Sequence, residues 1–227
     1  MDGDKPKMVG LKARMIRLAI IDYGSGNVRS VRRALEAAAQ GAGIPFEAIL
    51  TDDAEQIRQA DRIVLPGVGH FADCAAGLTG RPGVVEAMTE TVHGKGRPFL
   101  GVCVGMQLMA DVGREDFETK GLGWIPGAVE RIRPQPSLPV PHMGWNVLTD
   151  LAEHPVLAGL GSEPHVYFVH SYALSPTQAE HVAARCDYGG SFVAAVARDN
   201  LFGTQFHPEK SQRAGQVLLA NFLRWKP

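Results

Sequence analysis

The chain has 227 residues, of which 45% are hydrophobic and 21% are charged. This length fits one domain, and the ordinary composition excludes a disordered, collagen-like or disulfide-stapled chain. With 23 basic against 24 acidic residues spread along the sequence, the charge indicates neither a nucleic-acid partner nor an anionic membrane surface. No run of about 18 apolar residues could cross a bilayer as a helix.

Residues 1–15 lie ahead of the first apolar run and mix charged side chains with few apolar ones. They lack the apolar stretch of a secretory signal, so we expect a disordered extension on a cytoplasmic protein. The folded domain is expected to span residues 16–227.

The first half of the chain alternates short apolar runs with segments of helical periodicity. We expect strands at 17–22, 46–50, 62–65 and 98–102, and helices from residue 28 onward and at 53–60, 84–93 and 104–110. In the first helix the apolar positions are Val28, Val31, Leu35 and Ala38. This alternation is typical of βαβ units, which form a parallel sheet covered by helices on both faces.

The second half of the chain is richer in strands. We expect them at 123–133, 166–172, 181–186, 191–197 and 201–206, followed by a closing helix that carries Ala214, Val217, Leu218 and Leu223. A proline cluster at 134–141 is expected to cross the surface within one domain. The predicted fold is therefore an α/β three-layer sandwich, with helices on both sides of a mostly parallel, mixed sheet.

The segment Gly101-Val-Cys103-Val-Gly105 falls at a junction where a strand passes directly into a helix. A nucleophile between glycines at such a junction is typical of an elbow, in which a strained turn raises the side chain above the sheet. The following helix turns its backbone N–H groups toward the sulfur, which favours the thiolate. From this segment alone, a small buried cysteine in a glycine-rich turn is an equally good interpretation.

A second motif, His207-Pro-Glu209, follows the last expected strand. In extended backbone, residues two apart point to the same side, so Glu209 can hold the His207 imidazole in one tautomer. By itself this pair would fit a solvated loop. Because both motifs follow strands of the expected parallel sheet, a Cys-His-Glu relay is the better interpretation.

Together, Gly101–Leu108 and Phe206–Ser211 resemble the triad-type, class I glutamine amidotransferases. Further segments are similar to the glutaminase subunits of imidazole glycerol phosphate synthases, and these are Asp22–Ser30, Leu65–Gly69, Pro141–Asn146 and Tyr167–Tyr172. The resemblance extends from about Arg17 to the closing helix. It departs at Val104, where a larger aliphatic residue is expected, and at His70, where a small one is more usual.

The resemblance implies that Cys103 attacks the side-chain carboxamide of L-glutamine, with His207 as base and then acid and Glu209 as its orienting group. Oxyanion donors are expected from the Val104 N–H and from the loop that contains Gly67 and Gly69. A peptide flip in this loop would make the activity depend on a partner, although a simple tight turn is the alternative.

The resemblance also implies binding roles for several residues. Gln107, Ser171 and Tyr172 are expected to bind glutamine, although Gln107 could instead be an exposed helix residue. Asn27, Trp145 and Lys210 are expected at the face that meets a synthase partner, with Trp145 covering the site.

The expected partner is a cyclase subunit with a TIM barrel, which needs about 250 residues and must be a separate polypeptide of a heterodimer. The ammonia would pass to this partner, which forms imidazole glycerol phosphate and aminoimidazole carboxamide ribonucleotide in histidine biosynthesis. A glutaminase subunit of another complex and a catalytically silent regulatory module on the same fold are the alternatives.

The remaining cysteines and the histidines predict no metal and no cofactor. Cys74 and Cys186 are far apart in the sequence, which favours packed or partly exposed free thiols over a disulfide framework. None of the eight histidines forms the i, i+4 pair of a zinc helix or lies beside a Cys-x-x-Cys motif.

Overall fold

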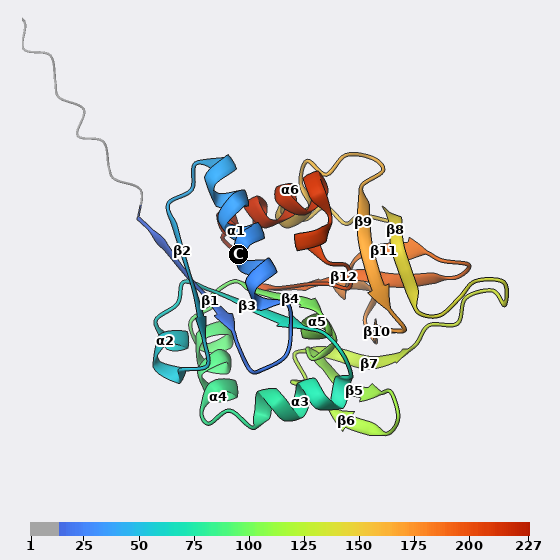
Figure 1. Cartoon of the computed structure of the whole chain (residues 1–227), viewed down its shortest axis with the longest axis horizontal. Coiled ribbons are helices and arrows are strands. Elements are labelled where there is room, and N and C mark those ends of the chain that lie inside the picture. The colour runs from blue at the N-terminus through green and yellow to red at the C-terminus, as the bar shows by residue number, and fades with distance from the viewer. Residues whose placement is uncertain (1–13) are drawn as a thin grey trace, which may run out of the picture.

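The computed structural model describes residues 14–227, and Figure 1 shows how their helices and strands are arranged. The extension predicted at residues 1–15 therefore lies, up to residue 13, outside the described residues. Within 14–227, no helix combines the length and the apolar character that a membrane crossing requires.

The described residues form a nine-stranded sheet with the strand order β2-β1-β3-β4-β13-β12-β11-β8-β9. Its first five strands are mutually parallel and comprise β2 (Phe46–Thr51), β1 (Ile16–Ile21), β3 (Arg62–Gly67), β4 (Phe99–Cys103) and β13 (Leu201–Thr204). The other four join by antiparallel pairing and comprise β12 (Ser191–Arg198), β11 (Val182–Asp187), β8 (His142–Thr149) and β9 (His165–His170).

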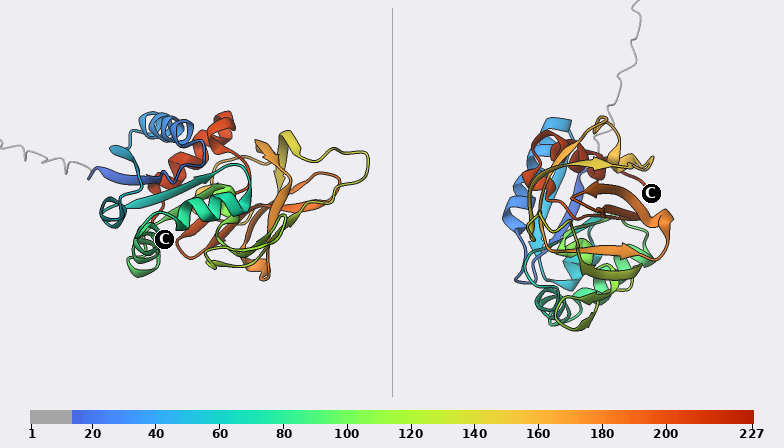
Figure 2. Two further views of the ribbon diagram at one scale, coloured as in Figure 1. Left: turned by 60° about the horizontal axis from the view of Figure 1, so that its bottom comes forward. Right: turned by 90° about the vertical axis from the view of Figure 1, so that its right-hand side faces the viewer.

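Helices cover both faces of the parallel half, as Figures 1 and 2 show. On one face α1 (Val28–Ala42) packs against α6 (Gln212–Arg224). On the other lie α2 (Ala54–Arg58), α3 (Phe71–Thr79), α4 (Val84–Thr89) and the π-helical turn η1 (Glu90–Gly94). The predicted α/β sandwich with a mixed central sheet is confirmed.

The periodicity of the first helix correctly identified its buried face. Val31, Leu35 and Ala38 are buried in α1, and the helix ends at Gly43, whose φ of 64° is the left-handed conformation that suits glycine. An apolar stripe of this kind has to be buried against another layer, which here is the sheet with α6 beside it.

A second, four-stranded sheet in the described residues was not predicted. It has the order β10-β7-β5-β6, with β10 (Tyr172–Pro176), β7 (Ile125–Arg131), β5 (Ala110–Arg114) and β6 (Glu118–Lys120). Three 3₁₀ turns complete the described elements: η2 (Pro155–Leu157), η3 (Ala179–His181) and η4 (Pro208–Lys210).

Two sequence predictions are wrong where the chain enters this second sheet. The helix expected at 104–110 is only α5 (Val104–Gln107), because the chain turns directly into β5 at Ala110. The strand expected at 166–172 is two strands in different sheets, since β9 ends at His170 and β10 begins at Tyr172. Residues 104–110 are all buried, and a run of buried residues does not reveal where a helix ends. In the second segment a single residue, Ser171, separates β9 from β10, so the two strands resemble one run in the sequence.

Two glycines in helices predict opposite effects of the same substitution on stability. A Cβ on Gly215 in α6 would collide with the backbone carbonyl of Pro208, whereas a Cβ on Gly41 in α1 would meet nothing within 4 Å. We expect Gly215→Ala to lower the free energy of unfolding by about 1–3 kcal/mol through overpacking. Gly41→Ala should raise it by about 0.5 kcal/mol, because alanine loses less backbone entropy in a helix.

Urea unfolding of the two variants measures this difference. Equal shifts of the unfolding midpoint in the same direction would contradict the packing of α6 on the Pro208 turn.

Candidate active site

Cys103 is the last residue of β4, and α5 begins at the next residue. Its φ of 55° and ψ of −114° lie in a region that residues with a side chain rarely adopt. The neighbouring parallel strand β13 pairs Thr204 with Val102, so both strands end at the same edge of the sheet. The strained strand-to-helix turn is the elbow that the sequence predicts.

Three glycines let the backbone pack closely beneath Cys103. A Cβ on Gly101 would lie 2.7 Å from the Gly105 carbonyl oxygen, and a Cβ on Gly105 would collide with the Leu65 carbonyl. A Cβ on Gly67 would lie 2.7 Å from the Gly105 nitrogen. Gly67 therefore belongs to the floor beneath the elbow, where only a residue without a side chain fits.

His207 and Glu209 form a buried pair at the turn after β13. The imidazole Nδ1 lies 2.8 Å from the Glu209 Oε1, and the two side chains are only 2% and 1% exposed. Among the described residues, His207 Nε2 has no hydrogen-bond partner. One ring nitrogen is thus fixed by a carboxylate, while the other remains available to exchange a proton.

The surroundings of His207 favour its protonated form. Burial by itself lowers the pKa of the imidazole, but the nearby Cys103 sulfur and the Glu209 carboxylate favour the protonated ring and raise the pKa to about 9. His207 therefore carries a proton at neutral pH.

Cys103 and His207 line one cavity of about 290 Å³. Of the predicted substrate-binding residues, Gly69, Val104, Gln107, Ser171 and Tyr172 line it as well. Gln107 is buried, and its Nε2 donates to the Tyr172 carbonyl at 2.9 Å and to Gln205 Oε1 at 3.0 Å. The alternative of an exposed Gln107 is therefore wrong.

The loop after β3 is held by side chains from two other segments. Tyr23 donates its hydroxyl to the Pro66 carbonyl at 2.9 Å, and Ser25 donates to the Val68 carbonyl at 2.8 Å. Cys74 Sγ also lies 3.4 Å from the Val68 oxygen. Because a peptide group is planar and trans, the Gly69 N–H points away from Ser25 and Cys74.

Sequence reasoning missed two residues of this site. Glu115 lines the cavity and accepts a hydrogen bond from the Phe71 N–H at 2.8 Å, yet it lies in a charged turn that reads as solvent-exposed. Gln205 is fully buried, and its Nε2 lies 3.7 Å from Cys103 Sγ. Its position at the end of an apolar strand, two residues before His207, was the available signal.

Two of the residues expected at a partner face lie around Tyr167. Lys210 Nζ lies 5.6 Å from the centre of the Tyr167 ring, and the Trp145 ring lies 5.9 Å from the same ring. Trp145 is 47% exposed, and Asn27 precedes α1 without capping it through its side chain. Trp145 does not line the Cys103 cavity.

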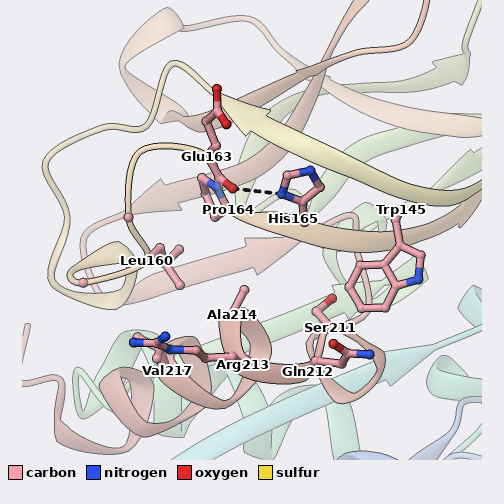
Figure 3. A pocket seen from close by; sticks show the side chains of 12 residues that line it. Trp145, Leu160, Glu163, Pro164, His165, Ser211, Gln212, Arg213, Ala214 and Val217 are labelled. Atoms are coloured by element: carbon pink, nitrogen blue, oxygen red, sulfur yellow. Dashed lines mark hydrogen bonds between the residues drawn. The ribbon is translucent and has the colours of Figure 1, made fainter.

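Trp145 instead borders a larger cavity of about 530 Å³, shown in Figure 3. This cavity lies between the start of α6 and the segment 159–165, and His165 Nδ1 lies 3.0 Å from the Glu163 carbonyl oxygen in its wall. None of the residues that line it is a cysteine. The larger cavity therefore has a different lining chemistry from the Cys103 cavity.

The other two thiols of the chain are closed off from solvent. Cys74 and Cys186 are 0% exposed, and burial raises the pKa of both, that of Cys186 to about 12. No group of three or more His, Cys, Asp or Glu side chains between residues 14 and 227 could hold a metal ion.

The coupling of His207 to Cys103 predicts a pKa change. Cys103→Ala removes the sulfur that helps to raise the pKa of His207, so this pKa should fall from about 9. A pH titration followed by the NMR signals of the histidine side chains measures it. Cys186→Ala, which removes a buried thiol on β11, is the control and should leave His207 unchanged. An unaltered His207 titration in Cys103→Ala would contradict the coupling.

Comparison with known proteins identifies the family. Residues 19–225 match the family model described as glutamine amidotransferase class-I. The imidazole glycerol phosphate synthase subunit HisH of Mesorhizobium japonicum is 54% identical over 216 residues, which cover 93% of this chain and 100% of that protein. The subunit of the same name from Bradyrhizobium diazoefficiens is 56% identical over 214 residues, or 92% of this chain and 99% of that protein.

Solved structures support the fold. A crystal structure of a glutamine amidotransferase superposes with a TM-score of 0.67 at 19% identity, covering 91% of this chain and 97% of that chain. A glutamine amidotransferase from Thermotoga maritima gives a TM-score of 0.58 at 15% identity, covering 88% and 79%. The chain therefore belongs to the class I glutamine amidotransferase family and, within it, to the group formed by the HisH subunits of imidazole glycerol phosphate synthase.

Proposed function

We propose that residues 16–227 form one amidotransferase domain that hydrolyses L-glutamine to glutamate and ammonia. The observation that carries this proposal is the convergence of the Cys103 elbow and the His207–Glu209 pair on one cavity of about 290 Å³. A nucleophile, a protonated imidazole and an orienting carboxylate are the groups that acyl transfer from an amide requires.

In the first half of the reaction, the Cys103 sulfur, whose proton is held by His207, adds to the carboxamide carbon and the amide oxygen becomes an oxyanion. The C–N bond then breaks, and the leaving nitrogen takes the proton of His207 to depart as ammonia. A thioester on Cys103 remains. Glu209 holds Nδ1 throughout, so Nε2 is the nitrogen that gives the proton.

In the second half, His207 takes a proton from a water molecule as the water adds to the thioester carbon. The C–S bond breaks, glutamate is released, and the imidazolium and the sulfur anion are restored. The raised pKa of His207, about 9, means that the proton returns to the imidazole at neutral pH.

The oxyanion would be stabilised by the backbone N–H of Val104 and by an N–H of the loop that contains Gly67 and Gly69. One such donor is typically worth about 3–4 kcal/mol. Gly69 has a φ of 96°, in the left-handed region that favours glycine, and the lack of a side chain lowers the steric cost of rotating its peptide. A loop of this kind fits an activity that a bound partner switches on.

Substrate recognition follows from the polar groups left free in the cavity. Both amide hydrogens of Gln107 are already donated, so the group that it offers is its carbonyl oxygen, an acceptor for the substrate's α-ammonium group. The Glu115 carboxylate supplies a charge of the right sign for the same group. Ser171 and Tyr172 complete this wall of the cavity.

We further propose a heterodimer in the cytoplasm with a cyclase subunit that has a TIM barrel. The ammonia would pass through a channel to this subunit, which acts as a lyase and forms imidazole glycerol phosphate and aminoimidazole carboxamide ribonucleotide in histidine biosynthesis. The names of the HisH relatives support this assignment. Exposed Met143 and Trp145 on β8, with Asn27 and Lys210, are the proposed contact face.

The nucleophile assignment predicts the effect of Cys103→Ala. Without the sulfur no thioester can form, so ammonia release from glutamine should fall by at least about 1,000-fold in the complex with the synthase partner. Synthesis from added ammonium salts should persist, because it bypasses the glutaminase cavity. Cys186→Ala should release ammonia at the wild-type rate. Wild-type protein that releases no ammonia when its partner and the partner's ligand are present would overturn the proposed function.

The role of Glu115 predicts a change in KM. Glu115→Gln removes the charge that faces the α-ammonium group, so KM for glutamine should rise about 10- to 100-fold with a smaller change in kcat. The control is Glu118→Gln, an exposed residue of the adjacent strand that pairs with Arg114. An unchanged KM in Glu115→Gln would remove Glu115 from the substrate site.

A further inference from the structure

Two buried histidines form a hydrogen-bonded pair: His142 on β8 and His170 at the end of β9, and His170 itself lines the Cys103 cavity. His142 Nδ1 lies 3.1 Å from His170 Nε2, and His170 Nδ1 lies 2.9 Å from the Tyr172 carbonyl oxygen. The two side chains are nearly inaccessible, at 2% and 6% exposure. In the proposed reaction neither ring has a step to perform.

The positions of the hydrogens in this series of hydrogen bonds follow from its last acceptor, the Tyr172 carbonyl oxygen. A carbonyl oxygen can only accept, so His170 Nδ1 carries the hydrogen. Burial lowers the pKa of both histidines to about 4, so each ring is neutral and has one bare nitrogen. His170 Nε2 is then an acceptor, and the donor that faces it is His142 Nδ1–H.

The same argument applies at the other end of the hydrogen-bond series, where His142 approaches Asn146. His142 Nε2 is bare and lies 3.5 Å from the Asn146 amide nitrogen. The orientation of that amide is fixed because Asn146 Oδ1 accepts from the Val147 N–H at 2.8 Å and Nδ2 donates to the Asp187 carbonyl at 2.8 Å. All donors therefore point in one direction, from β8 to Tyr172.

The Tyr172 carbonyl connects these histidines to Cys103. It also accepts from Gln107 Nε2, which donates its second hydrogen to Gln205 Oε1. Gln205 Nε2 in turn lies 3.7 Å from Cys103 Sγ. The orientation of both amides thus depends on where the Tyr172 oxygen is held.

Aromatic rings keep the two histidines in place. The His142 ring stacks on Tyr188 at a centroid distance of 3.9 Å and lies 4.9 Å from Phe168. The His170 ring lies 4.7 Å from Phe192. Stacking sets the plane of the His142 ring, the tilted contact with Phe192 restricts the His170 ring, and the hydrogen bonds set the rotation of each ring in its plane.

We propose that His142 and His170 are positioning residues of the glutaminase site, which fix the Tyr172 carbonyl and through it the Gln107 and Gln205 amides that face glutamine and Cys103. This inference rests on the proposed function for its kinetic consequences. The tautomers of the two rings do not depend on it.

The first test reads the tautomers directly. In the ¹⁵N-labelled protein at pH 7, both His142 and His170 should be neutral with the hydrogen on Nδ1, as two-bond nitrogen–hydrogen correlations report. An Nε2–H tautomer or a cation at His170 would overturn the proposed direction of the hydrogen bonds from His142 to Tyr172, whether or not the protein releases ammonia.

The second test uses kinetics of the complex with the synthase partner. His142→Phe keeps a stacking ring but removes the donor to His170, so KM for glutamine should rise about tenfold or more. His142→Asn places an amide N–H the same number of bonds from Cα as Nδ1, and it should recover part of the loss. Synthesis from ammonium salts should be unchanged in both variants.

A matched control separates positioning from packing. His181 is buried on η3 and takes no part in the hydrogen bonds between His142, His170 and Tyr172. His181→Phe therefore makes the same ring replacement without touching the Tyr172 carbonyl, and KM should stay at the wild-type value. A wild-type KM in His142→Phe, or an Asn variant no better than the Phe variant, would overturn the positioning role. A wild type that releases no ammonia would instead overturn the proposed function.

Discussion

The site depends on the close contact of bare backbone between α5 and the strands β3 and β4. Gly67, Gly101 and Gly105 leave no room for a side chain between these elements, so the chain can turn from β4 into α5 within one residue. That turn holds Cys103 at a positive φ and raises its sulfur above the sheet edge. Every other part of the site is arranged around this fixed sulfur. The loop after β3 shares the same contact, and the neighbouring strand β13 brings the following turn, with its imidazole, to the same edge.

The pKa values of the buried histidines His207 and His170 shift in opposite directions, because the groups that surround them differ. His207 faces a carboxylate and a sulfur, which outweigh the cost of burying a charge and raise its pKa to about 9. His170 faces a carbonyl and a second imidazole, so burial dominates and its pKa falls to about 4. The first ring can store and release a proton in the proposed reaction. The second keeps one fixed tautomer and can serve as a rigid part of the wall.

The elbow and the first helix were predictable from the sequence, because each depends on a local pattern of residues. The elbow follows from the spacing of Gly101, Cys103 and Gly105, and the buried face of α1 follows from its 3.6-residue period. The second sheet was not predictable, because the buried run through Leu108 to Ala110 has no turn signal where the helix ends. At Ser171 the chain changes sheets within a single residue, so β9 and β10 resemble one continuous strand in the sequence. Glu115 and Gln205 were missed because their roles depend on contacts far apart in the sequence.

The different environments of the three thiols make this protein suitable for site-specific labelling. Cys74 and Cys186 are sealed in the core, where burial favours the unreactive protonated form. Cys103 lines a cavity large enough to admit a small electrophile. A small reagent such as a haloacetamide should therefore attach at one position of the unmodified chain, without any engineered cysteine.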